Sequence, residues 1–482
     1  MDTFSKLEQI ISNHLQHETS PAAVLVEEGT PTASIAVLDG GNITSRCISA
    51  EGHNEETLFQ ACSISKPVAG TAMSILVGQG KAKFEDKIVE ILPRSVIERI
   101  ETPSTSILVK KITIKMLMSH TSGLSVHGFA GYVDDIPSTL EVLSGRAGIN
   151  TRQIRLDGIP GQRFSYSGGG MTVLQLIIEY IAQKPFSEVI QGLIFGPLGM
   201  HRSFYNIAES DGNLAKAHYT GYTACEVPYR TNPEQAAAGL WTTPTDLLKL
   251  VYALQRSLKC DDGSGFLDRD IARELLTEVK SNMGLTWLAP QSPGFAFAHA
   301  GSNEPGWNCM LIGYTDLHFS KPRDAEKWPE LFNDCGIAVM TNSATGISVI
   351  WKILNAIAYI KGWSATGEVG KILRKAEATI PFASIDKFLN PSWEIWIGDW
   401  SDDWKIEKGE NGNGIAVFGG LRVNLVPAAT PVDKDLNGSH LDVLLQGLEI
   451  MLRMGTDEKG RLIEIYDGGN GRITLVRPVP QQ

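Results

Sequence analysis

Apolar residues in the first 50 positions follow a helical spacing and then a strand spacing. On one face of a predicted amphipathic helix lie Phe4, Leu7, Ile10, Ile11 and Leu15. Residues 32–38 and 43–48 favour strands, and the intervening 39–42, Asp-Gly-Gly-Asn, is typical of a hairpin turn. The chain is therefore predicted to begin with a helix and two antiparallel strands.

Helical patterns dominate the next 200 residues. A helix is predicted after residue 63, and others over 111–124, ending at Gly123, over the later part of 160–179, and over 236–250, capped near Thr245. The segment 125–132 is rich in glycine and aromatic residues and is predicted to be an ordered loop beside a cleft. These helices form an insertion after the first hairpin.

Strand patterns return at 295–307 and 336–343, and a helix is predicted over 351–360. A hairpin, a helical insertion, further strands and a final helix predict one α/β (α+β) domain. We expect it to hold an antiparallel sheet and a helical subdomain.

The pattern changes after about residue 362. We predict a first domain over 1–365, a linker over 366–390, and about eight short alternating strands over 391–482. Such strands form a small antiparallel barrel or sandwich. No catalytic set is apparent in this last part.

The composition and charge of the chain limit the classes of partner that it is expected to bind. The chain has 482 residues, 43% of them hydrophobic, and a formal net charge of -11 without a basic run. Nucleic acid and anionic membranes are therefore not expected to bind. No signal peptide or long apolar span is apparent, and the six cysteines lack a CxxC or zinc spacing. We expect a cytoplasmic protein with free thiols and without a metal or cofactor.

Ser63 and Lys66 form the strongest candidate site. If Ser63 lies in the first helical turn, Lys66 at i+3 shares its face and its amine reaches the hydroxyl. A serine hydroxyl is a poor nucleophile without such a base. The alternative is structural, with Ser63 as a helix N-cap and Lys66 solvated. The same pattern recurs at Ser384 and Lys387 without other site features, so the context decides.

Two later stretches supply that context. Tyr166 precedes three glycines, beginning with Gly168, at the start of a helix, and His299 lies on a predicted strand just before Gly301 and Ser302. Each has an ordinary explanation as a buried residue. Cys62, next to Ser63, is a weaker alternative nucleophile because no activating partner lies at a helical spacing from it.

These motifs, Ser63-Ile-Ser-Lys66, Tyr166-Ser-Gly168 and His299-Ala-Gly301, occur in this order. With them the chain resembles the penicillin-recognising serine hydrolases, above all class C β-lactamases and their relatives among esterases, D-aminopeptidases and transacylases. The resemblance covers about residues 5–362 and implies a β-lactamase/transpeptidase-like domain. The last part resembles the lipocalin-like β-barrel of some members.

The resemblance implies a role for each residue. Ser63 would be the acylated nucleophile, and Lys66 would be its proton acceptor or the group that keeps Tyr166 partly ionised. Tyr166 would be the general base, and His299 would replace a more usual lysine. The backbone N–H groups of Ser63 and Ser302 would form the oxyanion hole. Possible substrate contacts follow from position or aromatic character: Gly168, Gly301, His127, Tyr132, Trp241 and Trp307.

Two departures from the usual motifs of this family argue against β-lactam antibiotics as substrates. Gly168 replaces a frequent asparagine, and His299 replaces a permanent cation that holds the β-lactam carboxylate. We therefore predict a serine hydrolase that forms an acyl-enzyme on a small ester or amide. The alternatives are an acyltransferase or thioesterase-type transacylase with the same intermediate, and a non-catalytic binding protein. A homo-oligomer is compatible with each.

Overall fold

The computed structural model describes most of the chain. The described residues are 1–12, 20–146, 148–205, 211–220, 222–260, 263–289, 296–315, 334–363, 381–383, 393–401, 403–428, 440–448, 450–457, 460–467 and 471–476. Among them, no helix is both long and apolar enough to cross a membrane. None of the six cysteines forms a disulfide.

A five-stranded antiparallel sheet forms the centre of the first part, in the order β2-β1-β9-β8-β7. The bounds of its strands are β1 (Thr32–Asp39), β2 (Asn42–Ser49), β7 (Ala296–Asn303), β8 (Trp307–Tyr314) and β9 (Gly336–Thr341). The hairpin predicted at 39–42 is confirmed, because Asp39 pairs with Asn42. Gly40 and Gly41 both have positive φ there, as a two-residue turn requires.

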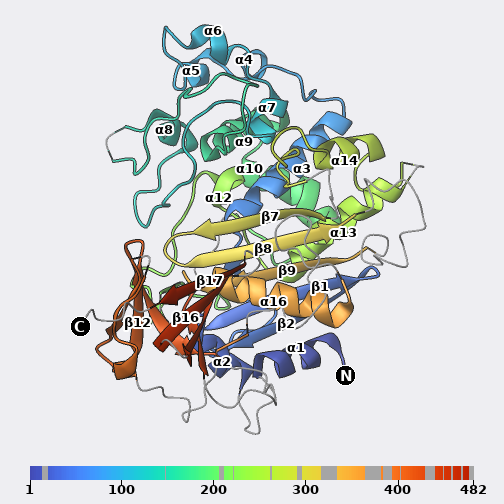
Figure 1. The fold of residues 1–482 in the computed structure, drawn as a ribbon. Helices are drawn as coiled ribbons and strands as arrows, with labels where there is room; N and C mark the ends of the chain where they lie inside the picture. The colour runs from blue at the N-terminus through green and yellow to red at the C-terminus, as the bar shows by residue number, and fades with distance from the viewer. Residues whose placement is uncertain are drawn as a thin grey trace.

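Alternate residues of these strands point to opposite faces of the sheet and belong to two cores. Ile35, Val37 and Val339 pack with helices α1 (Thr3–Ser12) and α16 (Gly346–Lys361). Ala36, Leu38 and Met340 pack on the other face with helix α13 (Pro244–Lys259) and the helical insertion. Figure 1 shows α16 across one face of the sheet and α13 behind it. The predicted α+β architecture is confirmed.

The insertion between β2 and β7 forms the helical part at the top of Figure 1. Its helices are α3 (Ser65–Gly78), α4 (Ile88–Ile91), α5 (Arg94–Ile97), α6 (Ser106–Val109), α7 (Ile114–Met118), α8 (Thr139–Ser144), α9 (Gly168–Ala182), α10 (Phe186–Ile190), α11 (Gly196–Leu198), α12 (Gln235–Ala238) and α14 (Arg269–Leu276). Short strands link them: β3 (Phe59–Gln60), β4 (His218–Tyr219), β5 (Thr223–Ala224) and β6 (Trp241–Thr242). Helix α2 (Pro21–Glu27) precedes the sheet.

Two boundaries differ from the prediction. Helix α7 ends at Met118, not at Gly123, because His120 takes a left-handed conformation, φ 55°, and its ring is fully buried. Helix α13 is capped by Thr243, whose hydroxyl accepts from the Asp246 N–H. Both differences follow from local backbone geometry that apolar spacing does not encode.

The C-terminal part is one eight-stranded antiparallel sheet that curls into a half-barrel, with its strands in chain order. Its strands are β10 (Gly398–Asp399), β11 (Lys405–Lys408), β12 (Gly414–Phe418), β13 (Leu421–Pro427), β14 (His440–Leu445), β15 (Ile450–Asp457), β16 (Gly460–Asp467) and β17 (Gly471–Val476). It has its own core, which includes Trp393, Trp396 and Trp400. Most of the predicted linker, 366–390, lies outside the described residues, and the exact domain boundaries stay a prediction.

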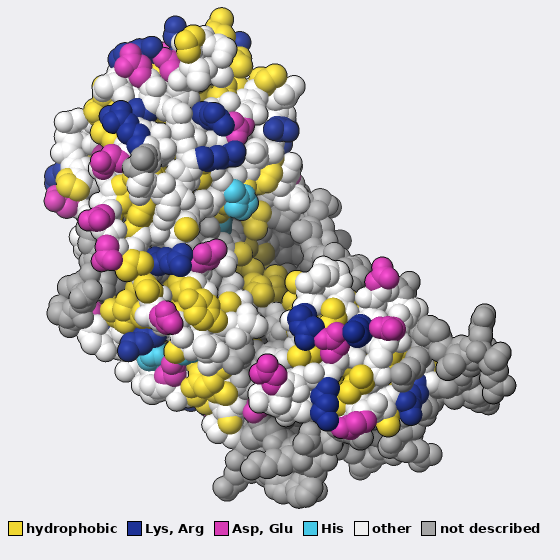
Figure 2. Space-filling model, turned by 90° about the vertical axis from the view of Figure 1, so that its left-hand side faces the viewer, with side chains coloured by type: hydrophobic (Ala, Val, Ile, Leu, Met, Phe, Trp, Pro, Cys, Tyr) yellow, Lys and Arg dark blue, Asp and Glu magenta, His cyan; other side chains and the backbone are white. Residues whose placement is uncertain are grey.

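The half-barrel contacts the first part through the turn between β14 and β15. Gln446 Nε2 donates to the Glu27 carbonyl at 2.8 Å, and Ser348 Oγ donates to the Leu448 carbonyl at 3.2 Å. The turn therefore lies against the start of α16. On this side the surface is hollowed between the helical part and the half-barrel, and hydrophobic side chains gather in the hollow (Figure 2).

Candidate active site

Ser63 lies in a short 3-10 turn, Cys62–Ile64, that leads directly into α3. Cys62 has a positive φ of 52° and is fully buried, whereas Ser63 is half-buried. The sharp turn thus directs the Ser63 backbone out of the core and presents its side chain to a cavity. A non-glycine residue with positive φ is uncommon and is often found at functional sites.

Lys66 is the nearest polar partner of Ser63. Its Nζ lies 2.9 Å from Ser63 Oγ and donates to the Ala237 carbonyl at 2.7 Å. The side chain is only 2% exposed. The i, i+3 contact expected from the sequence is therefore present, and α12, which carries Ala237, fixes the second side of the amine.

Tyr166 lies in the extended segment before α9 and is surrounded by imidazole rings. Its ring centroid is 4.4 Å from that of His120, 4.8 Å from that of His127 and 6.2 Å from that of His299. Lys66 Nζ lies 4.8 Å from the ring centre. No hydrogen bond among the described residues involves the Tyr166 hydroxyl. Its position is therefore set by ring packing, and the oxygen stays available to a substrate.

His299 is an uncharged hydrogen-bond acceptor in this site. Burial, with a smaller effect of the Lys66 charge, lowers the pKa of His299 to about 3. Its Nδ1 donates to the Ala300 carbonyl at 2.6 Å, so Nε2 carries the lone pair. That Nε2 has no partner among the described residues. At neutral pH, His299 therefore supplies an acceptor and no positive charge.

His120 supports Tyr166 from the opposite side. Burial, together with the nearby Lys66, holds the pKa of His120 well below its ordinary value. Its Nδ1 accepts from the Ser167 N–H at 3.1 Å, which places the proton of the neutral ring on Nε2. The sequence did not indicate a role for His120. A lone histidine has no spacing signal, because its partners come from distant segments.

The edge of β7 that does not pair with β8 faces Ser63. Ala298 exchanges both of its backbone hydrogen bonds with Leu288, so its N–H and C=O point away from β8. Hydrogen-bonding direction alternates along a strand, and Ser302, four residues later, therefore directs its N–H to the same side. Ser302 lines the cavity that contains Ser63. This orientation suits a donor to a substrate carbonyl.

Gly301 allows β7 to approach the Ser63 turn closely. A Cβ at this position would lie 2.6 Å from Cys309 Sγ, 2.7 Å from the Ala61 carbonyl and 2.8 Å from Cys62 Cβ. Only a glycine fits without displacing backbone. Burial also raises the pKa of the Cys62 thiol well above its ordinary value, which disfavours Cys62 as the nucleophile.

These groups share one cavity of about 820 Å³. Of the predicted site residues, its walls include Ser63, Lys66, His127, Tyr166, His299, Gly301 and Ser302. The predicted loop 125–132 contributes a wall as expected. Phe129 of that loop is one of the apolar wall residues, and others that the sequence did not indicate are Phe164, Met283, Leu288 and Ile347.

Four predicted contact residues lie elsewhere. Gly168 is buried beneath the loop, where a Cβ would lie 2.8 Å from Phe129 Cε2. Trp307 is fully buried and packs edge-on against Phe59 and Trp241. Tyr132 and Trp241 line a second cavity. Aromatic character alone did not distinguish cavity walls from core packing.

The antiparallel sheet, the helical insertion and the cavity at the sheet edge define a β-lactamase/transpeptidase-like fold. A structure titled "Structure of the octameric penicillin-binding protein homologue from Pyrococcus abyssi" superposes with a TM-score of 0.59 over 99% of this chain and 100% of that chain, at 18% identity. The model of the beta-lactamase family matches residues 7–350, and the chain belongs to this family.

Two relatives give the range of this similarity. Protein Rv1367c of Mycobacterium tuberculosis is 30% identical over 220 residues, which are 41% of this chain and 54% of the relative. Esterase EstB of Burkholderia gladioli is 28% identical over 171 residues, 33% of this chain and 41% of the esterase. The chain thus spans about half the length of the relatives it matches.

Proposed function

We propose that this protein hydrolyses small esters or amides through an acyl-enzyme on Ser63. The observation that carries the proposal is the 2.9 Å contact between Lys66 Nζ and Ser63 Oγ inside a cavity that also contains Tyr166. A nucleophile, a base and a second proton-carrying group within one cavity are what acyl transfer requires.

The first half of the reaction forms an ester on the protein. Ser63 Oγ attacks the substrate carbonyl carbon, and its proton passes to the Lys66 amine. The oxygen of the tetrahedral intermediate accepts from the N–H groups of Ser63 and Ser302. The bond to the leaving group then breaks, and the Tyr166 hydroxyl delivers a proton to that group. Water next attacks the ester with Tyr166 as base. The bond to Ser63 Oγ then breaks, Lys66 returns its proton to that oxygen, and the acid leaves.

The cavity favours an uncharged acyl group. His299 is neutral, and the Glu304 carboxylate at the rim is paired with Arg230 at 3.3 Å. The walls between them are largely apolar. An N–H or O–H of the substrate can donate to His299 Nε2. An anionic acyl group meets no positive charge on His299, which argues against β-lactam carboxylates as preferred substrates.

Hydrolysis is favoured over transfer to a second substrate because the cavity is open to water. The rim residue Glu304 is 74% exposed, and Ser302 is also exposed. Product analysis with a thioester, with and without added alcohols and amines, tests this choice. An acylated acceptor in place of the free acid would assign the protein to the acyltransferases.

The decisive test compares Ser63→Ala with Ser384→Ala, which alters the second Ser-x-x-Lys match. We expect Ser63→Ala to abolish hydrolysis of p-nitrophenyl butyrate and the mass increase after fluorophosphonate treatment. The Ser384→Ala protein should retain both. Labelling of the Ser63→Ala protein at the wild-type level would refute the proposed nucleophile.

A further inference from the structure

A second cavity of about 640 Å³ adjoins the active-site cavity and shares Ala238 with it. Its walls come from the segments 211–216 and 227–232, together with Gln60, Tyr132, Tyr205 and Trp241. Asn303, a residue of the first cavity, donates through Nδ2 to Gln60 Oε1 at 2.9 Å and to the Ala238 carbonyl at 3.1 Å. This contact separates the two spaces.

Two buried polar groups on the walls of the second cavity lack partners. Tyr205 is 5% exposed and Asn232 is 6% exposed. Neither Tyr205 Oη nor Asn232 Oδ1 has a hydrogen-bond partner among the described residues. Burial raises the pKa of Tyr205 well above its ordinary value, so its hydroxyl is an O–H donor. Buried polar groups are nearly always paired, and a ligand would satisfy both.

The charges on these walls favour an anion. Asp211 is neutralised by Arg202, with N–O distances of 2.6 and 3.2 Å. Lys216 and Arg230 supply positive charge, but Arg230 also forms an ion pair with Glu304, with an N–O distance of 3.3 Å. No ion pair of Lys216 is found among the described residues. Lys216 is therefore the cation most available to a ligand.

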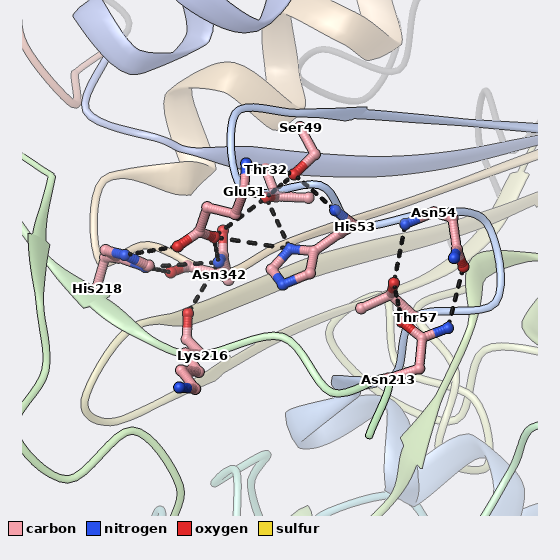
Figure 3. A network of polar contacts seen from close by, with 10 residues as sticks. All are labelled: Thr32, Ser49, Glu51, His53, Asn54, Thr57, Asn213, Lys216, His218 and Asn342. Carbon is pink, nitrogen blue, oxygen red and sulfur yellow. Dashed lines mark hydrogen bonds and ion pairs between the residues drawn. The ribbon is translucent and has the colours of Figure 1, made fainter. Parts of the chain in front are cut away.

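A polar network fixes the segment that carries Lys216 (Figure 3). Asn342 Nδ2 donates to the Lys216 carbonyl at 2.8 Å and to Glu51 Oε2 at 2.8 Å, and Glu51 Oε1 lies 3.1 Å from His218 Nε2. Burial lowers the pKa of His218, but the hydrogen bond and charge of Glu51, together with backbone hydrogen bonds, outweigh burial and leave that pKa raised. In Figure 3 the Lys216 side chain points away from this network. The backbone is thus anchored while the ammonium stays available.

We propose that the second cavity binds a small aromatic carboxylate. Tyr132, Tyr229 and Trp241 offer aromatic surface, and the rings of Tyr229 and Trp241 pack with centroids 5.8 Å apart. Lys216 pairs with the carboxylate, Tyr205 donates to a ligand oxygen, and Asn232 accepts from a ligand O–H. The cavity volume lies in the range of small-molecule sites.

Isothermal titration calorimetry of the full chain with 4-hydroxyphenylacetate tests this proposal. The uncharged 4-hydroxyphenylacetamide serves as the matched probe. We expect the carboxylate to bind about tenfold more tightly than the amide, because a charge-assisted contact is lost in the amide. Lys216→Met should remove that difference, and Tyr205→Phe should weaken both probes about three- to tenfold.

Two controls locate the probe. Lys81→Met removes an exposed lysine outside both cavities, and Lys66→Met alters only the first cavity; both should leave the dissociation constants unchanged. Equal affinity for acid and amide in the wild-type protein, or no heat from either probe at millimolar concentration, would overturn the proposal. Weakening by Lys66→Met but not by Lys216→Met would assign the probe to the first cavity and overturn it equally.

Discussion

The two adjoining cavities differ in how their polar groups are held. In the first, Lys66 is positioned by both Ser63 and Ala237 before any substrate arrives. In the second, Tyr205 Oη and Asn232 Oδ1 are buried without partners among the described residues. A reacting group gains from being oriented in advance, whereas a recognition group must keep its hydrogen bond for the ligand. The contrast agrees with the roles proposed above, catalysis in the first cavity and ligand binding in the second.

The largest predicted effect comes from a substitution that alters the first cavity and not the second. Lys66→Met should lower kcat/KM for p-nitrophenyl butyrate by about 10²- to 10⁴-fold, the usual loss when a general base is removed. The calorimetric affinity for 4-hydroxyphenylacetate should not change. Lys81→Met is the matched control and should retain full activity. A Lys66→Met protein with wild-type kcat/KM would contradict the role of Lys66.

A second prediction concerns the helix whose last residue lines both cavities. Glu234 directly precedes α12, is fully buried, and has both carboxyl oxygens unpartnered among the described residues. Burial raises the pKa of Glu234 from 4.5 to about 7. The folded state therefore holds this proton more tightly than the unfolded state, and stability is lost as the pH rises from about 4.5 through 7.

The loss amounts to about 3 kcal/mol for a pKa difference of this size. Urea unfolding at pH 5 and pH 8 measures it. In Glu234→Gln, which keeps the shape without the ionisation, the difference between the two pH values should shrink by about that amount. An unchanged pH dependence in the variant would show that Glu234 does not titrate as described. Glu304→Gln serves as the control for stability, because the carboxylate that it replaces is exposed to solvent in the folded protein.

The smallest predicted effect reverses the charge preference of the first cavity. His299→Lys introduces a cation where the wild-type residue is neutral. We expect the ratio of kcat/KM for the p-nitrophenyl half-ester of glutarate to that for p-nitrophenyl pentanoate to rise about tenfold, as for one partly buried ion pair. His299→Gln keeps an acceptor without charge and should leave the ratio unchanged. A ratio equal in both variants would argue against charge selection at this position.

The sequence predicted best what depends on local spacing. The Gly40-Gly41 hairpin, the α1 face and the i, i+3 contact of Ser63 with Lys66 are each encoded within a few residues. The order of the three motifs predicted that Tyr166 and His299 lie in the same cavity. By contrast, the position of His120 is set by Ser167 and Tyr166, and the second cavity is assembled from six separate stretches. Such arrangements depend on tertiary packing, which produces no periodic pattern in the sequence.

One feature of the sheet limits the size of what can be bound. The outer edge of β7 is covered by Leu288 at Ala298 and is open at Ser302, beside the nucleophile. An exposed strand edge invites pairing with any extended chain, including other copies of the same protein. Among the described residues the uncovered part of this edge is short, so a ligand that lies along it in extended form has room for few main-chain contacts.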